Sequence, residues 1–202
     1  MKRLALLFVP VLLLAGSSPI QVGRRLPDVT IQDEGALVPA CTEVNGHMAL
    51  VSKQLGHRPW SSREMDGRVR TLYHLAARMG IDDVNKPFID ALIAAKLPEY
   101  TPDGAYKTIT ILDLSDALWG TVGLGRSRLE SSQRDFPWAI HVMDDRGVAR
   151  AAWQLPPKQS SVIILDRDGT VLFFKVGKLS PEEIGRAIGI IKEHLAKPLP
   201  HG

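Results

Sequence analysis

Residues 160–195 constrain the fold more strongly than any other part of the sequence. Residues 161–165 form a short apolar run rich in β-branched side chains, and a second apolar run occupies residues 170–176. Between them, Asp166-Arg167-Asp168-Gly169 has the composition of a turn, so this segment predicts a β-hairpin. Ser180-Pro181-Glu182-Glu183 then supplies an N-cap hydroxyl, an early proline and a third-position carboxylate, which predicts the start of a helix. The end of the chain is therefore expected to be a ββα unit.

A strand–helix–strand pattern lies upstream of this unit. Residues 69–75 are expected to form a buried strand, a helix is expected to begin at or near Pro87, and residues 106–113 are expected to form the next strand. This spacing predicts a βαβ unit with parallel strands and a right-handed connection. A helix near residues 127–134 and a strand at residues 138–142 would join the two units. We therefore predict one α/β domain with a central mixed sheet flanked by helices.

The N-terminal residues have the pattern of a secretory signal peptide. Lys2 and Arg3 precede an apolar run at residues 4–15, and small residues follow, so cleavage is expected after Ser17. The run is too short for a membrane span, so we expect an exported protein with no membrane anchor after signal removal. The expected organisation is a signal peptide at 1–17, an N-terminal extension with short strands at 18–59, the main domain at 60–197 and a tail at 198–202.

The N-terminal extension carries weaker signals. Residues 29–31 and 36–38 flank Asp33-Glu34-Gly35 and predict a small hairpin, and Asn45-Gly46 predicts another turn. We therefore expect an irregular β extension in front of the main domain.

Charge and cysteine content narrow the function classes. Without Lys2 and Arg3, the chain's 25 basic residues fall to 23 against 22 acidic ones, so nucleic acid is not an expected partner. Cys41 is the one cysteine of the sequence, so the domain has no internal disulfide.

The order of a βαβ unit, a connecting helix and a ββα unit is that of thioredoxin. The sequence also resembles the YtfJ family of periplasmic proteins over residues 60–195. The segments that carry this resemblance are residues 67–76, 96–98, 128–131, 147–150, 152–155 and 160–161. The resemblance implies a thioredoxin-like fold and a periplasmic location, and it implies no particular activity.

The markers of dithiol chemistry are absent. Such chemistry needs a thiolate at the N-terminus of the helix after the first central strand, and residues 76–83 at that junction contain no cysteine. If Asp166 matches the aspartate that usually closes the later strand, Ser160 occupies the place of the cis-proline that faces the thiols. We therefore predict a redox-inactive binding or accessory module. The alternative is a single-cysteine thiol oxidoreductase or peroxidase that uses Cys41.

A binding site for an anion is predicted where two loops of this fold should meet. Arg78, in the loop after the first central strand, should lie beside Ser160 and Ser161, and a guanidinium with hydroxyls suits an anionic group or a peptide carboxylate. The expected partner is a periplasmic protein of unknown identity or a small anionic ligand. No cofactor and no metal are expected, because the histidines show no ligand spacing.

Three further motifs have simpler explanations. Residues 166–171 mimic the first motif of haloacid-dehalogenase-type phosphatases, but only 32 residues follow Thr170, so a hairpin turn is expected there. Residues 123–127 lack the lysine of a phosphate-binding loop and predict a loop leading into a helix. The aromatic side chains of Phe136, Trp138 and Trp153 are expected in the core.

Overall fold

The structure is a computed structural model that describes residues 19–99 and 104–198. The predicted signal peptide and most of the predicted tail lie outside the described residues. The strands are β1 (Thr30–Val44), β2 (His47–Ser61), β3 (Val69–Ala76), β4 (Tyr106–Asp113), β5 (Ile140–Asp144), β6 (Ser160–Leu165) and β7 (Val171–Val176). The α-helices are α1 (Lys86–Ala94), α2 (Val122–Asp135), α3 (Val148–Trp153) and α4 (Pro181–Ala196). Each described helix is too short or too polar to cross a membrane.

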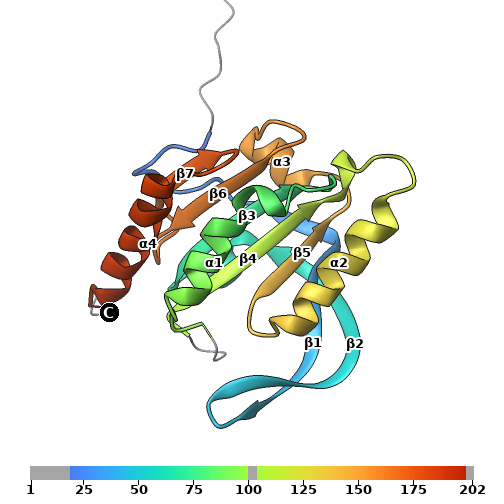
Figure 1. Ribbon diagram of the computed structural model, residues 1–202, viewed down its shortest axis with the longest axis horizontal. Coiled ribbons are helices and arrows are strands. Elements are labelled where there is room, and N and C mark those ends of the chain that lie inside the picture. Colours follow the sequence, from blue (N-terminus) through green and yellow to red (C-terminus); the bar gives the residue numbers. More distant parts are fainter. Residues whose placement is uncertain (1–18, 100–103, 199–202) are drawn as a thin grey trace, which may run out of the picture.

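All seven strands form one mixed sheet, in the order β2-β1-β5-β4-β3-β6-β7 (Figure 1). Strands β3, β4 and β5 are parallel to one another. Strand β6 pairs antiparallel with both β3 and β7, as the predicted ββα unit requires. This arrangement confirms the thioredoxin-like fold with a βαβ unit followed by a ββα unit.

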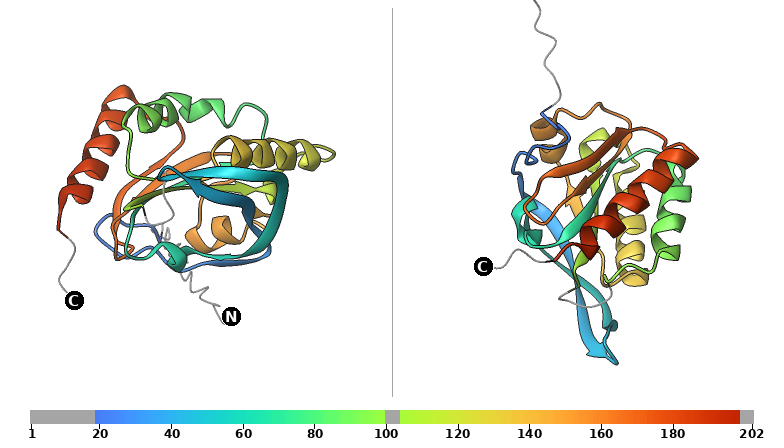
Figure 2. Two further views of the ribbon diagram at one scale, coloured as in Figure 1. Left: turned by 90° about the horizontal axis from the view of Figure 1, so that it is seen from below. Right: turned by 90° about the vertical axis from the view of Figure 1, so that its left-hand side faces the viewer.

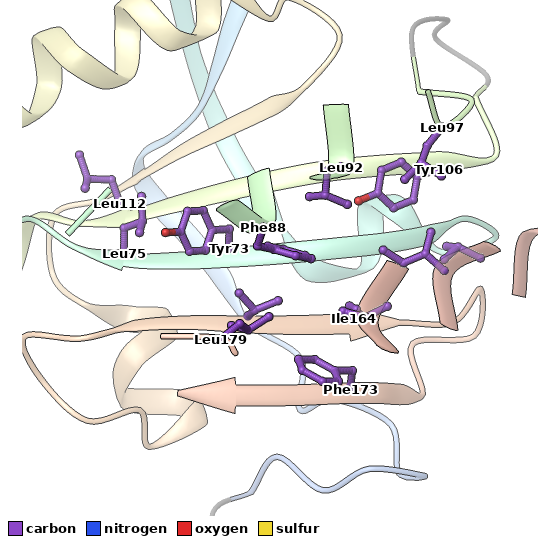
Figure 3. Packing of buried hydrophobic residues seen from close by; sticks show 14 of the residues in the cluster. Tyr73, Leu75, Phe88, Leu92, Leu97, Tyr106, Leu112, Ile164, Phe173 and Leu179 are labelled. Carbon is purple, nitrogen blue, oxygen red and sulfur yellow. The ribbon is translucent and has the colours of Figure 1, made fainter. Parts of the chain in front are cut away.

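The two faces of the sheet carry different layers. Helices α1, α2 and α4 cover one face, whereas α3 and the segment before β1 cover the other (Figure 2). Side chains alternate along the central strands. Tyr73 and Leu75 of β3 therefore point toward Phe88 and Leu92 of α1 (Figure 3). Leu72, which directly precedes Tyr73, packs in the cluster on the α3 face. With both faces covered, every residue of the central strand β3 is buried.

The local signals of the C-terminal unit act as the sequence predicts. The Ser180 hydroxyl accepts from the Glu183 amide, and the Glu183 carboxylate accepts from the Ser180 amide, so the capping box at the start of α4 is complete. At the turn between β6 and β7, Gly169 adopts a φ of 85° and donates its amide to the Asp166 carbonyl. The phosphatase-like motif is thus a hairpin turn.

The prediction for the N-terminal extension is partly wrong. Asn45-Gly46 does connect two strands, but each strand is 15 residues long, and residues 33–35 lie inside β1 rather than in a turn. Glu34 and Gly35 both have positive φ, and the register with β2 shifts there. A glycine in the left-handed region can make a bulge as well as a turn, and here it bends β1 without reversing the chain.

This long hairpin extends past the rest of the sheet. Strand β1 pairs with β5 only through Gly35 and Ala36, and beyond these residues β1 and β2 pair only with each other. Figure 1 shows their far ends projecting from the domain. Cys41 lies on this projecting part, where it pairs with Leu50.

Candidate functional site

The loop after β3 occupies the place where a thioredoxin-type enzyme carries its thiols. It leaves the sheet at Ala77, whose amide donates to the Asp113 carbonyl, and turns at Gly80 with a φ of 74°. Residues 83–85 form a short 3-10 helix that leads into α1. The loop presents Arg78 and Met79, and Met79 is 77% exposed.

Asn85 fixes the end of this loop against the opposite loops of the sheet. Its side chain is buried and donates Nδ2 to the Gly177 carbonyl at 2.9 Å and to the Ser160 hydroxyl at 3.2 Å. Its Oδ1 accepts from the Leu179 amide at 2.9 Å. Tyr73 lies beside this cluster, and burial raises the pKa of its hydroxyl to about 12. The polar cluster therefore acts as a structural clamp, and sequence reasoning missed it because Asn85 has no local partner.

The structure does not assemble the predicted site of Arg78, Ser160 and Ser161. Arg78 is half-buried at the surface, but both serines are completely buried within β6. Ser160 pairs with Leu75 of β3, and its hydroxyl accepts a hydrogen bond from Asn85 Nδ2. Ser161 pairs with His74 and points to the other face of the sheet. Only Arg78 therefore remains as a residue that could meet a ligand.

A groove lies between α1 and α2 on the face that the loop overhangs. It consists of two adjoining hollows of about 180 and 300 Å³, which share Leu75, Asp82, Thr110 and Ser132. The loop after β3 and the start of α2 border the smaller hollow, and α1 and the end of α2 border the larger one. Their remaining apolar lining includes Tyr73, Ala77, Met79, Ile81, Ile89, Leu92, Ile93, Leu112, Leu118, Leu124, Leu129, Phe136, Trp138 and Ala139.

The rim of this groove exposes large apolar side chains. Met79, Leu118 and Leu124 line the smaller hollow, and Ile93 and Phe136 line the larger one, although each is at least one-third exposed. Phe136 also packs edge-on against Trp138, with the ring centroids 5.9 Å apart. The expectation of core positions is therefore confirmed for the fully buried Trp153 and wrong for Phe136, which borders open space.

Charged groups are unevenly distributed around the groove. Arg78 and Arg128 line the smaller hollow, where Arg128 lies 3.7 Å from Asp82 across the opening. Within the described residues the Arg78 side chain has no hydrogen-bond or ion-pair partner, and its Nε is buried. In the larger hollow, Lys86 is paired with Asp90 at 2.7 Å, and burial raises the pKa of Glu99 above its usual range.

His141 forms the polar part of the groove floor. Gln133 Nε2 donates to two backbone carbonyls, so its Oε1 faces His141 Nδ1 at 3.1 Å as an acceptor. Nδ1 therefore carries the proton, and Nε2 accepts from the Ser132 hydroxyl at 2.9 Å. Burial lowers the pKa of His141 to about 4. His141 is therefore a packed, hydrogen-bonded histidine. Ser132 lies inside α2, where backbone amides are engaged in the helix and cannot form an oxyanion hole.

A second polar cluster lies on the α3 face, at the carboxyl ends of the parallel strands. Asp113, completely buried, accepts from Arg150 Nε at 2.7 Å and from the Ser115 hydroxyl at 2.5 Å. Asp144 caps α3 through the amides of residues 148 and 149. His74 is also buried here, and burial is the main reason why its pKa falls to about 4. Asp113 and Asp144 are therefore engaged within the protein, whereas neither ring nitrogen of His74 has a hydrogen-bond partner among the described residues.

Cys41 is remote from both clusters. It lies on the projecting hairpin and is partly buried, and this burial raises the pKa of its thiol. A raised pKa reduces the thiolate fraction, which is the reactive form.

Comparisons with known proteins agree with this geometry. Residues 20–194 match the family described as "Bacterial protein of unknown function (YtfJ_HI0045)". The chain belongs to the YtfJ family. It is 34% identical to the uncharacterised protein YtfJ of Escherichia coli (strain K12) over 194 residues, 96% of this chain and 97% of that protein. A Haemophilus influenzae relative, also uncharacterised, is 31% identical over 85% of each chain.

Solved structures place this YtfJ-family chain among thioredoxin-like folds. A Chlorobium tepidum protein described as thiol:disulfide interchange protein DsbE matches with a TM-score of 0.56 and 14% identity, over 88% of this chain and 99% of that one. A Bacteroides thetaiotaomicron protein described as a protein disulfide isomerase matches with a TM-score of 0.57 and 16% identity, over 89% and 93% of the two chains. At these identities the likeness shows the fold alone.

Proposed function

We propose that this chain is a periplasmic thioredoxin-fold protein that binds a ligand in the groove between α1 and α2 and performs no thiol redox chemistry. The observation that carries the proposal is the loop at residues 77–83. It contains no cysteine where a thioredoxin-type enzyme needs one, and it forms the wall of an open apolar groove instead. Export is proposed from the signal-like residues 1–17.

The position of Cys41 supports a non-redox role. Thiol exchange requires a thiolate at an activated, accessible position, usually at a helix N-terminus. Cys41 lies instead on a β-hairpin with its thiol pKa raised by burial. The fold therefore lacks an activated nucleophile at the place where this architecture provides one.

The redox part of the proposal is tested with the purified protein and its Cys41→Ser variant. Thiol–disulfide exchange and peroxide reduction are measured side by side, and we expect no activity in either protein. Activity that disappears in Cys41→Ser would overturn the proposal and establish a single-cysteine oxidoreductase or peroxidase.

The binding part is tested with an environment-sensitive apolar dye such as ANS. Ala77 lines the smaller hollow, so Ala77→Trp should fill it and reduce dye binding. Ala152→Trp provides a matched control, because Ala152 is exposed on α3 and faces away from the groove. Equal dye binding by both variants and the parent protein would contradict a binding groove.

Export is tested by fractionation of cells that produce the full chain. We expect a processed protein beginning at residue 18 in the periplasmic fraction. An unprocessed chain retained in the cytoplasm would contradict this part of the proposal.

A further inference from the structure

The inference concerns the class of ligand, and it rests on the proposed binding function. The groove combines a long apolar lining with a cation that lacks an internal partner. Arg78 lines the smaller hollow, and no ion pair or side-chain hydrogen bond engages it within the described residues. A buried or half-buried guanidinium is stabilised by a carboxylate, which accepts two parallel hydrogen bonds from it. The smaller hollow is therefore suited to an anionic group.

Apart from its charged side chains and the hydroxyls of Tyr73 and Thr110, the rest of the groove offers little hydrogen-bonding capacity. The Thr108 hydroxyl already donates to Glu99, and the Thr121 hydroxyl donates to a backbone carbonyl. Ser132 is engaged with His141. The strands that form the floor, β3 and β4, are paired on both sides, so they present no free strand edge.

The absence of a free strand edge discriminates between ligand classes. An extended peptide would bury most of its amides in the groove without hydrogen bonds, at a cost of about 1–3 kcal/mol for each group. A hydrocarbon chain has no such groups and gains from burial against the apolar lining. Taken together, the two adjoining hollows of about 180 and 300 Å³ fall in the size range of small-ligand sites.

We propose that the groove binds a single acyl chain that ends in a carboxylate, with the carboxylate paired to Arg78 and the chain lying between α1 and α2. The charges fix this direction. Asp82 lines both hollows, but Asp83 and Glu99 line only the larger one, where Lys86 is already paired with Asp90, whereas Arg78 and Arg128 line only the smaller one. An anionic head is therefore repelled from the larger hollow, which receives the end of the chain instead.

The test compares ligands that differ in one property. Dodecanoate, dodecanol and butyrate are titrated, below the micellar range, into purified protein by calorimetry and by displacement of the apolar dye. We expect dodecanoate to bind more tightly than dodecanol, because only dodecanoate pairs with Arg78. Butyrate should bind at least a hundredfold more weakly than dodecanoate, because it buries eight fewer methylenes.

Two variants test the head group. Arg78→Gln should weaken dodecanoate binding by about tenfold to a hundredfold and leave dodecanol binding unchanged. Leu124→Asp places a negative charge in the smaller hollow on a half-exposed side chain and should also weaken dodecanoate more than dodecanol. Thermal unfolding of both variants checks that the fold is intact. If Arg78→Gln does not fold, Leu124→Asp alone tests whether the smaller hollow binds the carboxylate.

The outcomes separate this inference from the proposed function. If dodecanol binds as tightly as dodecanoate, or if both variants bind dodecanoate like the parent protein, the assignment of an acyl carboxylate is overturned. If Ala77→Trp reduces dye binding but dodecanoate does not displace the dye, the groove remains a binding site and the proposed ligand class is wrong. Failure of the dye test removes the proposed function itself.

Discussion

Replacement of Asn85 by alanine should destabilise the protein by about 2–5 kcal/mol. Asn85 is 1% exposed, and its amide joins three backbone or side-chain groups from the β6–β7 side of the fold: Ser160, Gly177 and Leu179. Alanine leaves the Gly177 carbonyl and the Leu179 amide without this partner. Each buried group that loses its hydrogen bond costs about 1–3 kcal/mol, and the Ser160 hydroxyl adds a smaller amount because it can rotate. The total is a large fraction of a typical folding free energy of about 5–15 kcal/mol.

The measurement is urea denaturation followed by tryptophan fluorescence, with Asp83→Ala as the matched control. Asp83 begins the same short helix but is exposed, so its removal should change the free energy of unfolding by less than about 0.5 kcal/mol. Asn85→Asp tests the donor role separately, because a carboxylate can accept from Leu179 and cannot donate to Gly177. If Asn85→Ala is as stable as Asp83→Ala, the clamp does not hold the loop and the reasoning is refuted.

Three other perturbations follow from the packing. Because the pKa of His141 falls from 6.5 to about 4 on folding, the unfolded chain binds more protons at this residue between these pH values. The contribution of His141 to stability should be complete above about pH 6.5 and should decrease by up to about 3 kcal/mol as the pH falls to 4. His74, whose pKa also falls to about 4, adds to the loss over the same range. Urea denaturation at pH 7 and pH 5 should show a smaller difference in His141→Gln, and an unchanged difference would contradict the assignment. Gly35→Ala should lower the thermal midpoint more than Gly46→Ala. Both glycines have positive φ, but only at Gly35 would an added Cβ lie 2.2 Å from a backbone carbonyl of β2. Arg150→Ala should cost about 2 kcal/mol or more by denaturation, since the buried Asp113 loses its cation; a loss under about 0.5 kcal/mol would show that Ser115 suffices.

The main domain could be predicted from the sequence because its signals are local. The capping box at Ser180, the turn before Thr170 and the apolar run of β6 each involve residues close together in the chain. Such signals fix where an element begins and ends, and the right-handed crossover rule then supplies the topology. The resemblance to the YtfJ family agreed with the fold, and the periplasmic location that it implies stays a prediction.

The long hairpin and the groove could not be predicted in the same way. Whether Glu34-Gly35 makes a turn or a bulge depends on the partner strand β2, which faces it across more than 20 residues of chain. The hydrogen bonding of the Ser160 hydroxyl depends on Asn85, which is 75 residues away in the chain. A pattern of residue types does not tell which of two faces a buried hydroxyl points to, so the two serines were expected beside Arg78 and lie inside the sheet.

The residues that border the groove are largely separate from those that hold the fold. Met79 and Leu124 have exposed side chains, and Arg78 has no internal partner among the described residues, so their substitution removes little from the folded state. Asn85 and Asp113, by contrast, are buried and fully engaged. Because half-exposed apolar side chains gain little from folding where they stand, we expect their clustering around one groove to serve the proposed ligand rather than stability. A substitution at the rim that abolishes ligand binding without changing the thermal midpoint would therefore show that the residue belongs to a binding site and not to the edge of the core.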